Sequence, residues 1–209
     1  MIKKLFFAFT CISLISCNQN SNTKTNKSNQ GTSYTLPFPQ GWKTELFSLP
    51  VKFAPAIAYK GVEDIRFAPG WEKATSNEYW TYCFLWCLED SIHIDAKIIE
   101  KNLEAYYTGL IGSNVQQNKI SSNSIIQTET SFDKAATANG DLETFTGTIR
   151  MLDYMKQEPI TLNCMVHLTS CPQQSNTYLF HEISPKPFTD SVWKSLHQIW
   201  TGFACSSNK

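Results

Sequence analysis

Apolar and polar positions begin to alternate at Tyr34, and this pattern marks the folded part of the chain. Strand-like alternation predicts strands at 45–58, 62–68, 78–89, 122–132, 142–155, 160–170 and 176–184. The strand at 78–89 is apolar at both odd and even positions, which predicts that both of its faces are covered. A short polar link at 169–176 predicts that the last two strands form a β-hairpin.

Two segments have a helical period instead. The first follows Asp95, which is a good helix cap, and Gly112 supplies the predicted stop. The second is predicted to begin at Thr189 or Asp190 and to end near Phe203. Apolar residues recur every three or four positions in both segments: Ile99, Leu103, Tyr106 and Leu110 in the first, and Val192, Leu196, Ile199 and Phe203 in the second.

These elements predict an α+β fold with a single antiparallel β-sheet and an amphipathic helix packed on each face. The order of the elements, with Gly41-Trp42 near the start, resembles the PsbP-like sandwich of extrinsic photosystem subunits over residues 36–203. The resemblance implies a domain that works mainly by binding other proteins. It includes no specific motif, so it assigns no functional residue.

The N-terminus has the three parts of an export signal. Lys3-Lys4 precede an apolar run from Leu5 to Ile15, and a bilayer-spanning helix needs about 20 residues, so this run is too short to be an anchor. The sequence Leu14-Ile15-Ser16-Cys17 resembles the lipobox of bacterial lipoproteins. The resemblance implies that residues 1–16 are removed as a signal peptide and that Cys17 carries a diacylglycerol lipid, which would hold the protein on a membrane.

Three regions are therefore expected along the chain. After the signal peptide, residues 17–33 comprise the lipidated Cys17 and a polar linker without apolar side chains, which is typical of a flexible tether. Residues 34–209 form a single globular α+β domain. We expect an exported protein that is lipid-anchored at the cell membrane or the outer membrane, and Asn18 favours the outer membrane.

Charge excludes one class of partner. Removing Lys3 and Lys4 leaves 16 of the 18 basic residues against 18 acidic ones, a net charge near −2. Nucleic-acid binding needs a concentrated basic face, so we expect no nucleic-acid partner.

Five cysteines lie in the expected domain. Cys83 and Cys87 would lie about 13 Å apart on one strand, too far to share a disulfide or a metal. Cys171 and Cys205 lie outside regular strands and are the most plausible disulfide partners. The alternative is that all five are buried thiols packed as small hydrophobic residues.

Three groups of residues are candidate sites, and each has an ordinary structural alternative. Glu89, Asp90, His93 and Asp95 surround the start of the first helix, where they form either a cation or acid–base site or a solvated turn. His167 and His181 lie on adjacent arms of the hairpin. They could hold a metal if they share a face and a third ligand is added, or they are ordinary sheet histidines.

The third group is a run of rings on one strand face. Trp80, Tyr82, Phe84 and Trp86 form either a platform for a ligand or the floor beneath a helix.

No catalytic, phosphate-binding or dinucleotide-binding motif occurs, so we expect no catalytic residue, no metal and no cofactor. The preferred hypothesis is a membrane-tethered, non-catalytic domain that binds another cell-envelope protein. The first alternative is a binder of a small apolar or carbohydrate ligand, which predicts an aromatic-lined cleft. The second alternative is a hydrolase that uses the Glu89–Asp95 group or the two histidines.

Overall fold

The computed structural model describes residues 33–118, 120–121, 124–138, 140–172 and 174–206. The predicted signal peptide, Cys17 and all of the predicted linker except Ser33 lie outside the described residues. Within the described part of the chain, neither helix has the length and apolar character needed to cross a bilayer.

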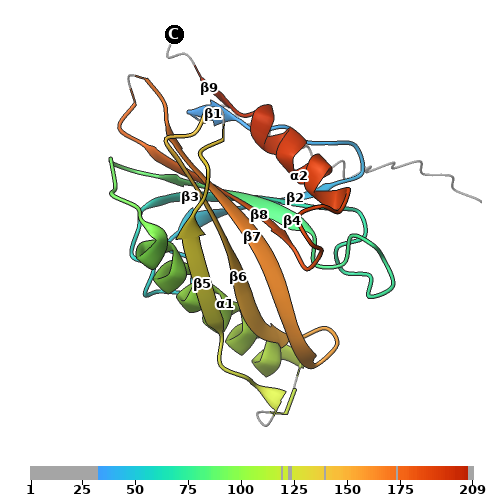
Figure 1. Ribbon diagram of the computed structural model, residues 1–209. Coiled ribbons are helices and arrows are strands. Elements are labelled where there is room, and N and C mark those ends of the chain that lie inside the picture. Colours follow the sequence, from blue (N-terminus) through green and yellow to red (C-terminus); the bar gives the residue numbers. More distant parts are fainter. Residues whose placement is uncertain (1–32, 119, 122–123, 139, 173, 207–209) are drawn as a thin grey trace, which may run out of the picture. The chain divides into compact units, whose positions relative to one another are not determined.

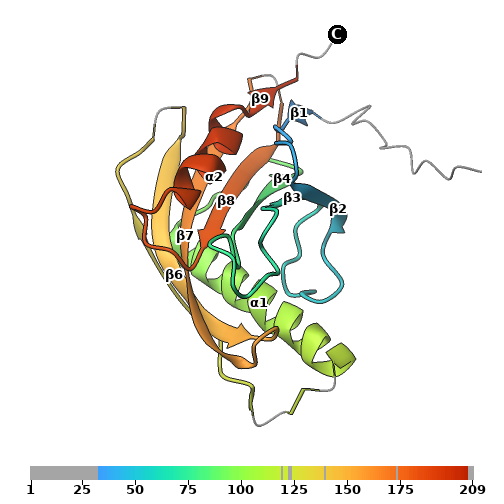
Figure 2. The same ribbon diagram turned by 90° about the vertical axis from the view of Figure 1, so that its right-hand side faces the viewer.

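Seven antiparallel strands form the main sheet, in the order β2-β3-β4-β8-β7-β6-β5 (Figure 1). Their bounds are β2 Lys43–Leu49, β3 Gly61–Phe67, β4 Tyr82–Leu88, β5 Glu129–Lys134, β6 Glu143–Asp153, β7 Glu158–Ser170 and β8 Thr177–Ser184. The helices are α1, Ala96–Asn118, and α2, Val192–Thr201. Helix α1 lies against β5 and β6, and α2 lies against β8 (Figure 2).

The predicted fold class is wrong. The described chain is mostly β, with nine strands in two sheets, and it is not the α+β sandwich of a single sheet with a helix on each face that the PsbP-like resemblance implied. The second sheet pairs β1, Tyr34–Thr35, with β9, Ala204–Cys205. Strands of two residues show no alternation over the four or more positions that a sequence pattern needs, so they could not be read from the sequence.

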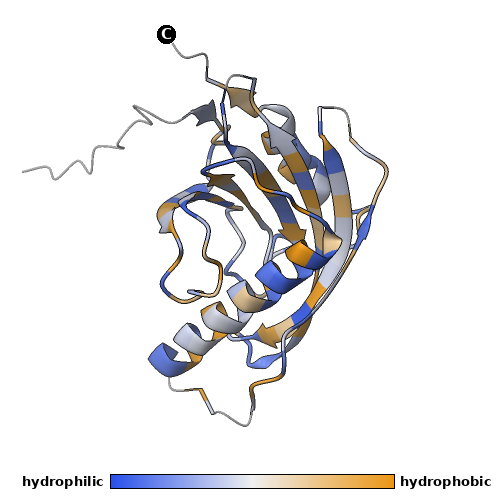
Figure 3. Cartoon of the chain, turned by 90° about the vertical axis from the view of Figure 1, so that its left-hand side faces the viewer, coloured by the Kyte–Doolittle hydropathy of each residue, from blue (hydrophilic) through white to orange (hydrophobic). Residues whose placement is uncertain are grey.

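Strand β4 lies in the interior of the main sheet, between β3 and β8, and is buried along its whole length, as predicted. Its even-numbered residues join a large apolar cluster that also contains Leu103 and Tyr107 of α1. Its odd-numbered residues join a smaller cluster with Leu196 and Ile199 of α2. Along the strands of the main sheet, hydrophobic and hydrophilic residues alternate (Figure 3). The period-2 pattern of the sequence thus separates two cores.

Helix α1 continues past its predicted stop at Gly112. Ile111 and Val115 extend the buried stripe of the helix by another turn, and their burial outweighs the cost of one glycine, about 1 kcal/mol relative to alanine. Gly112 faces open space, so it has no packing role that would end the helix there. At the other end, the Asp95 carboxylate accepts the backbone N–H of Ile98 at 2.8 Å, as expected for the cap.

Candidate functional site

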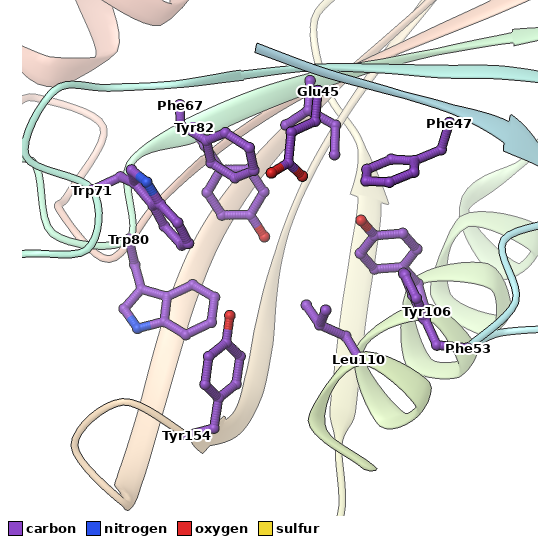
Figure 4. A pocket seen from close by; sticks show the side chains of 11 residues that line it. Glu45, Phe47, Phe53, Phe67, Trp71, Trp80, Tyr82, Tyr106, Leu110 and Tyr154 are labelled. Carbon is purple, nitrogen blue, oxygen red and sulfur yellow. The ribbon is translucent and has the colours of Figure 1, made fainter. Parts of the chain in front are cut away.

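A cavity of about 160 Å³ opens between the β2–β3–β4 edge of the main sheet, helix α1 and three loops (Figure 4). The lining consists almost entirely of rings and aliphatic side chains: Glu45, Phe47, Phe53, Ile65, Phe67, Trp71, Trp80, Tyr82, Tyr106, Leu110 and Tyr154. An apolar cavity of about 150 Å³ is large enough to hold a benzene ring. This cavity therefore has room for one small organic molecule.

Three ring pairs of the lining stand at steep angles, whereas Phe67 lies closer to parallel with Trp71, at 32°, and with Tyr82, at 30°. The planes of Trp71 and Trp80 meet at 85°, and those of Trp80 and Tyr154 meet at 74° with centroids 5.2 Å apart. On the opposite wall, Phe53 packs edge-on against Tyr106 at 5.0 Å. Edge-to-face packing of this kind fixes the orientation of each ring, so the walls are set before any ligand enters.

Trp80 is held in an unusual backbone conformation. Its φ of 54° lies in the left-handed region, which a bulky side chain occupies at a cost of about 1–3 kcal/mol unless the surroundings impose it. Its backbone N–H donates to the carbonyl of Trp71 at 2.8 Å, which ties the two indoles to the same wall. Strain of this kind at a cavity wall is typical of a binding site.

The polar groups of the cavity lining are one carboxylate, three phenol hydroxyls and two indole N–H groups, and the N–H groups of Trp71 and Trp80 have no hydrogen-bond partner among the described residues. Glu45 is the one charged residue among the eleven that line it, and its carboxylate points into the cavity, as do the hydroxyls of Tyr106 and Tyr154 (Figure 4). Neither lysine nor arginine is among these lining residues. The hydroxyl of Tyr82 is 2.5 Å from that of Tyr107 and is therefore already hydrogen-bonded.

A second carboxyl group lies next to this lining. Glu63 is paired across the sheet with Phe47 on one side and Trp86 on the other, and its side chain is fully buried. Burial raises the pKa of Glu63 to about 7, although the Trp86 indole N–H donates to its Oε1 at 3.1 Å and opposes the rise. The Tyr106 hydroxyl, which hydrogen-bonds to the same carboxyl group, also opposes the rise. The field around the cavity therefore becomes more negative as the pH rises through 7.

The aromatic stripe predicted from the sequence divides between the cavity and the helix. Trp80 and Tyr82 line the cavity. Phe84 and Trp86 instead lie beneath α1, with the ring of Tyr106 stacked on Phe84 at 5.5 Å and tilted over Trp86 at 6.0 Å. The position of each ring relative to α1 thus determines whether it lines the cavity or packs beneath the helix.

Glu89, Asp90 and His93 are exposed in the turn before α1, and Asp95 is partly buried as the helix cap. The closest approach within this group is 3.7 Å, between His93 Nε2 and Asp95 Oδ2. The histidine side chain is 83% exposed. The arrangement matches the solvated turn considered for these residues.

His167 and His181 do not share a face of the sheet. The register pairs His167 with Phe180 and His181 with Val166, so the two imidazoles project in opposite directions. His181 is stacked on Phe84 with centroids 4.2 Å apart, and burial lowers its pKa to about 3, so it is uncharged. A shared metal site for these two histidines is therefore excluded by the register.

Cys171 and Cys205 form a disulfide with their Cα atoms 5.6 Å apart. The other three cysteines of the described chain, Cys83, Cys87 and Cys164, are free and buried. Burial raises the pKa of the Cys83 and Cys164 thiols well above the ordinary range, which is typical of inert core cysteines.

Several cavity residues were missed by the sequence analysis. Phe53, Trp71 and Tyr154 come from loops, although the sequence analysis placed Phe53 and Tyr154 in predicted strands, and the direction of a loop side chain does not follow a strand period. The one available signal was the density of rings at 67–84. Glu45 was missed because it lies on an exposed edge strand among other polar residues.

Comparison with models of known protein families finds no family that matches this chain, and no curated protein sequence matches it either. Its function is therefore inferred from the geometry of the aromatic cavity.

Proposed function

We propose that the domain binds a small organic cation, such as a methylated ammonium group, in the aromatic cavity. The observation that carries this proposal is the combination of a box of rings with a single charged lining residue, Glu45, which is negative. Cations are attracted to the faces of aromatic rings, and aromatic cages are the usual site for quaternary ammonium ligands. The carboxyl of Glu63 next to the lining adds negative charge above pH 7.

This proposal refines the small-ligand alternative of the sequence analysis. A carbohydrate is less well supported, because a sugar needs several hydrogen-bond partners and most of the exposed surface of the lining is apolar. The volume of about 160 Å³ suits a group no larger than a single ring or a trimethylammonium group with a short chain.

The test uses choline and its uncharged analogue 3,3-dimethyl-1-butanol, which has the same shape with carbon in place of nitrogen. We expect calorimetric titration of the intact protein to give saturable choline binding, and binding of the uncharged analogue about tenfold weaker or more. Equal affinities for the two compounds, or no choline binding, would overturn the proposal. Tighter binding of methyl glucoside than of choline would favour the carbohydrate alternative instead.

A substitution at Glu45, an exposed strand residue, tests whether its charge contributes to binding without disturbing the fold. Glu45→Gln should weaken choline binding about tenfold while the uncharged analogue is unaffected, since only the cation senses the lost charge. The matched control is Glu129→Gln on the edge strand β5, because Glu129 is also an exposed strand glutamate but does not line the cavity. If both variants bind choline as the parent protein does, Glu45 is not part of the site.

We further propose that this domain is exported and held on the cell membrane or the outer membrane by lipid on Cys17. The support is the lipobox and the polar segment that follows it. Mass spectrometry of the native protein should find an N-terminal Cys17 whose mass is increased by acyl chains, and a Cys17→Ser variant should leave the membrane fraction. An unmodified Cys17, or an N-terminus elsewhere, would contradict this proposal.

Binding of another envelope protein stays a prediction, which a pull-down from solubilised membranes tests.

A further inference from the structure

A second cluster of polar groups lies on the α2 side of the main sheet, away from the aromatic cavity. His167 of β7, Glu182 of β8 and His197 of α2 each offer one ligand atom, and these atoms all lie within 4.8 Å of one another. The His167 and Glu182 side chains are 0% and 1% exposed, whereas His197 is 49% exposed. Two buried groups and one accessible group thus converge from three separate elements.

Two of the three distances between ligand atoms in the cluster match the edges of a metal coordination shell, and the third, between His167 and His197, is at most 4.8 Å. Nε2 of His167 lies 3.3 Å from Oε1 of Glu182, and Nδ1 of His197 lies 3.4 Å from the same oxygen. Ligands at about 2.0–2.1 Å from a tetrahedral Zn²⁺ lie about 3.3 Å from each other. The two buried atoms His167 Nε2 and Glu182 Oε1 lie within ion-pair distance of each other, but neither makes a well-aligned hydrogen bond among the described residues. Buried polar atoms of native proteins are rarely left without such a partner, and either a proton on the imidazole or a bound cation would supply it.

Asp141 orients His167 as a metal ligand. The Asp141 carboxylate lies 2.7 Å from Nδ1 of His167, and it also accepts the hydroxyl of Thr144 at 2.5 Å and the indole N–H of Trp200 at 2.9 Å. Three partners fix this carboxylate in place. A proton held between Asp141 and Nδ1 leaves the lone pair of Nε2 directed at Glu182 and His197. Histidine ligands of metals almost always have such a carboxylate or carbonyl partner on their other nitrogen.

Charge and access agree with a divalent cation. Asp141 and Glu182 place two carboxylates in the interior, and a single ion of charge +2 would neutralise both. Glu182 and His197 also line a cavity of about 320 Å³, together with Thr144, Met165 and Trp193. The fourth coordination position would thus face a space that holds water.

We propose that His167, Glu182 and His197 form a Zn²⁺ site whose fourth position is open to this cavity. Two histidines and one glutamate, with a water molecule as the fourth ligand, are a known ligand set for zinc. The sequence analysis expected no metal, and it paired His167 with the wrong histidine. Its true partner, His197, lies on the half-exposed side of α2 and was not considered.

The test measures Zn²⁺ binding to the intact protein by competition with a chromogenic chelator. We expect a single ion per chain, and Co²⁺ in its place should give the intense visible absorption of a tetrahedral site. His197→Ala should weaken Zn²⁺ binding about 100-fold, and Asp141→Asn about 10–100-fold through the orientation of His167. Because His197 is half-exposed, its variant should fold, which circular dichroism checks.

The matched control is His93→Ala, since His93 is an exposed histidine next to a carboxylate but far along the chain from the cluster. It should leave Zn²⁺ affinity unchanged.

The alternative is a metal-free network in which protons on the two imidazoles balance the carboxylates. A folded protein that binds no Zn²⁺, or a His197→Ala variant that binds it as the parent does, would overturn the proposal in favour of that network.

Discussion

Replacing Arg66 by methionine should lower the free energy of unfolding by about 3–5 kcal/mol, the cost of leaving a buried charge without its partner. Arg66 and Asp64 form an ion pair in which both side chains are 4% exposed, and the guanidinium also donates to the carbonyl of Pro37 and the hydroxyl of Thr44. After the substitution, the Asp64 carboxylate keeps the Tyr34 hydroxyl, at 3.2 Å, but loses its counter-charge.

The control is Arg150, the only other arginine in the sequence. Arg150 pairs with Glu129 at 3.4 Å, but their side chains are 48% and 59% exposed, so Arg150→Met should cost less than about 1 kcal/mol. A double variant, Asp64→Leu with Arg66→Met, should recover most of the loss, because it removes both buried charges together. Urea unfolding at pH 7 measures all three. Equal losses for Arg66→Met and Arg150→Met would show that burial does not set the strength of the pair.

The stability of the protein should fall as the pH rises from 4.5 to about 7, and Glu63 should be the main cause. In the unfolded chain a glutamate loses its proton near 4.5, but burial raises the pKa of Glu63 in the folded protein to about 7. Between these values the unfolded state releases a proton that the folded state keeps, so ionisation favours unfolding. The difference of 2.5 pKa units (7 − 4.5) corresponds to about 3 kcal/mol, lost in full above pH 7.

Glu63→Gln should remove this pH dependence, because glutamine has the shape of the protonated acid and never ionises. The variant should match the parent protein in free energy of unfolding at pH 4.5 and exceed it by about 3 kcal/mol at pH 8. Other groups titrate over this range, so the quantity to compare is the difference between variant and parent at each pH. Glu129→Gln, at an exposed strand position, serves as the control and should follow the parent curve. A constant difference between Glu63→Gln and the parent from pH 4.5 to 8 would contradict the assignment.

Strand periodicity predicted the long elements of this protein well. The pattern at 78–89 identified the central strand and assigned its residues to two cores, and the link at 169–176 identified the β7–β8 hairpin. Both features depend on local spacing, which the sequence contains directly. The predicted architecture failed on the shortest elements. Strands β1 and β9 pair over only two residues from opposite ends of the described chain, and although the sequence indicated the Cys171–Cys205 disulfide, it did not indicate this pairing.

The candidate sites depended on information of a different kind. Whether His167 and His181 share a face is decided by a one-residue choice of register, and the sequence leaves this open. The aromatic cavity and the proposed zinc site both gather residues from elements far apart in the chain, such as Glu45 with Tyr154 and His167 with His197. The residue types indicate which side chains could belong to each site, but the topology of the fold determines which of them lie together.

The sheet of β1 and β9 determines how the domain would respond to mechanical load. If the chain before Ser33 is a membrane tether, a pull on it enters the domain through β1, whose partner strand β9 ends at Cys205. The bond from Cys205 to Cys171 fastens β9 covalently to the residue that follows β7. Tension would thus act first on the pairing of β1 with β9, while the disulfide keeps β9 in place, so this pairing must break before the pull reaches β2 and the seven-stranded sheet.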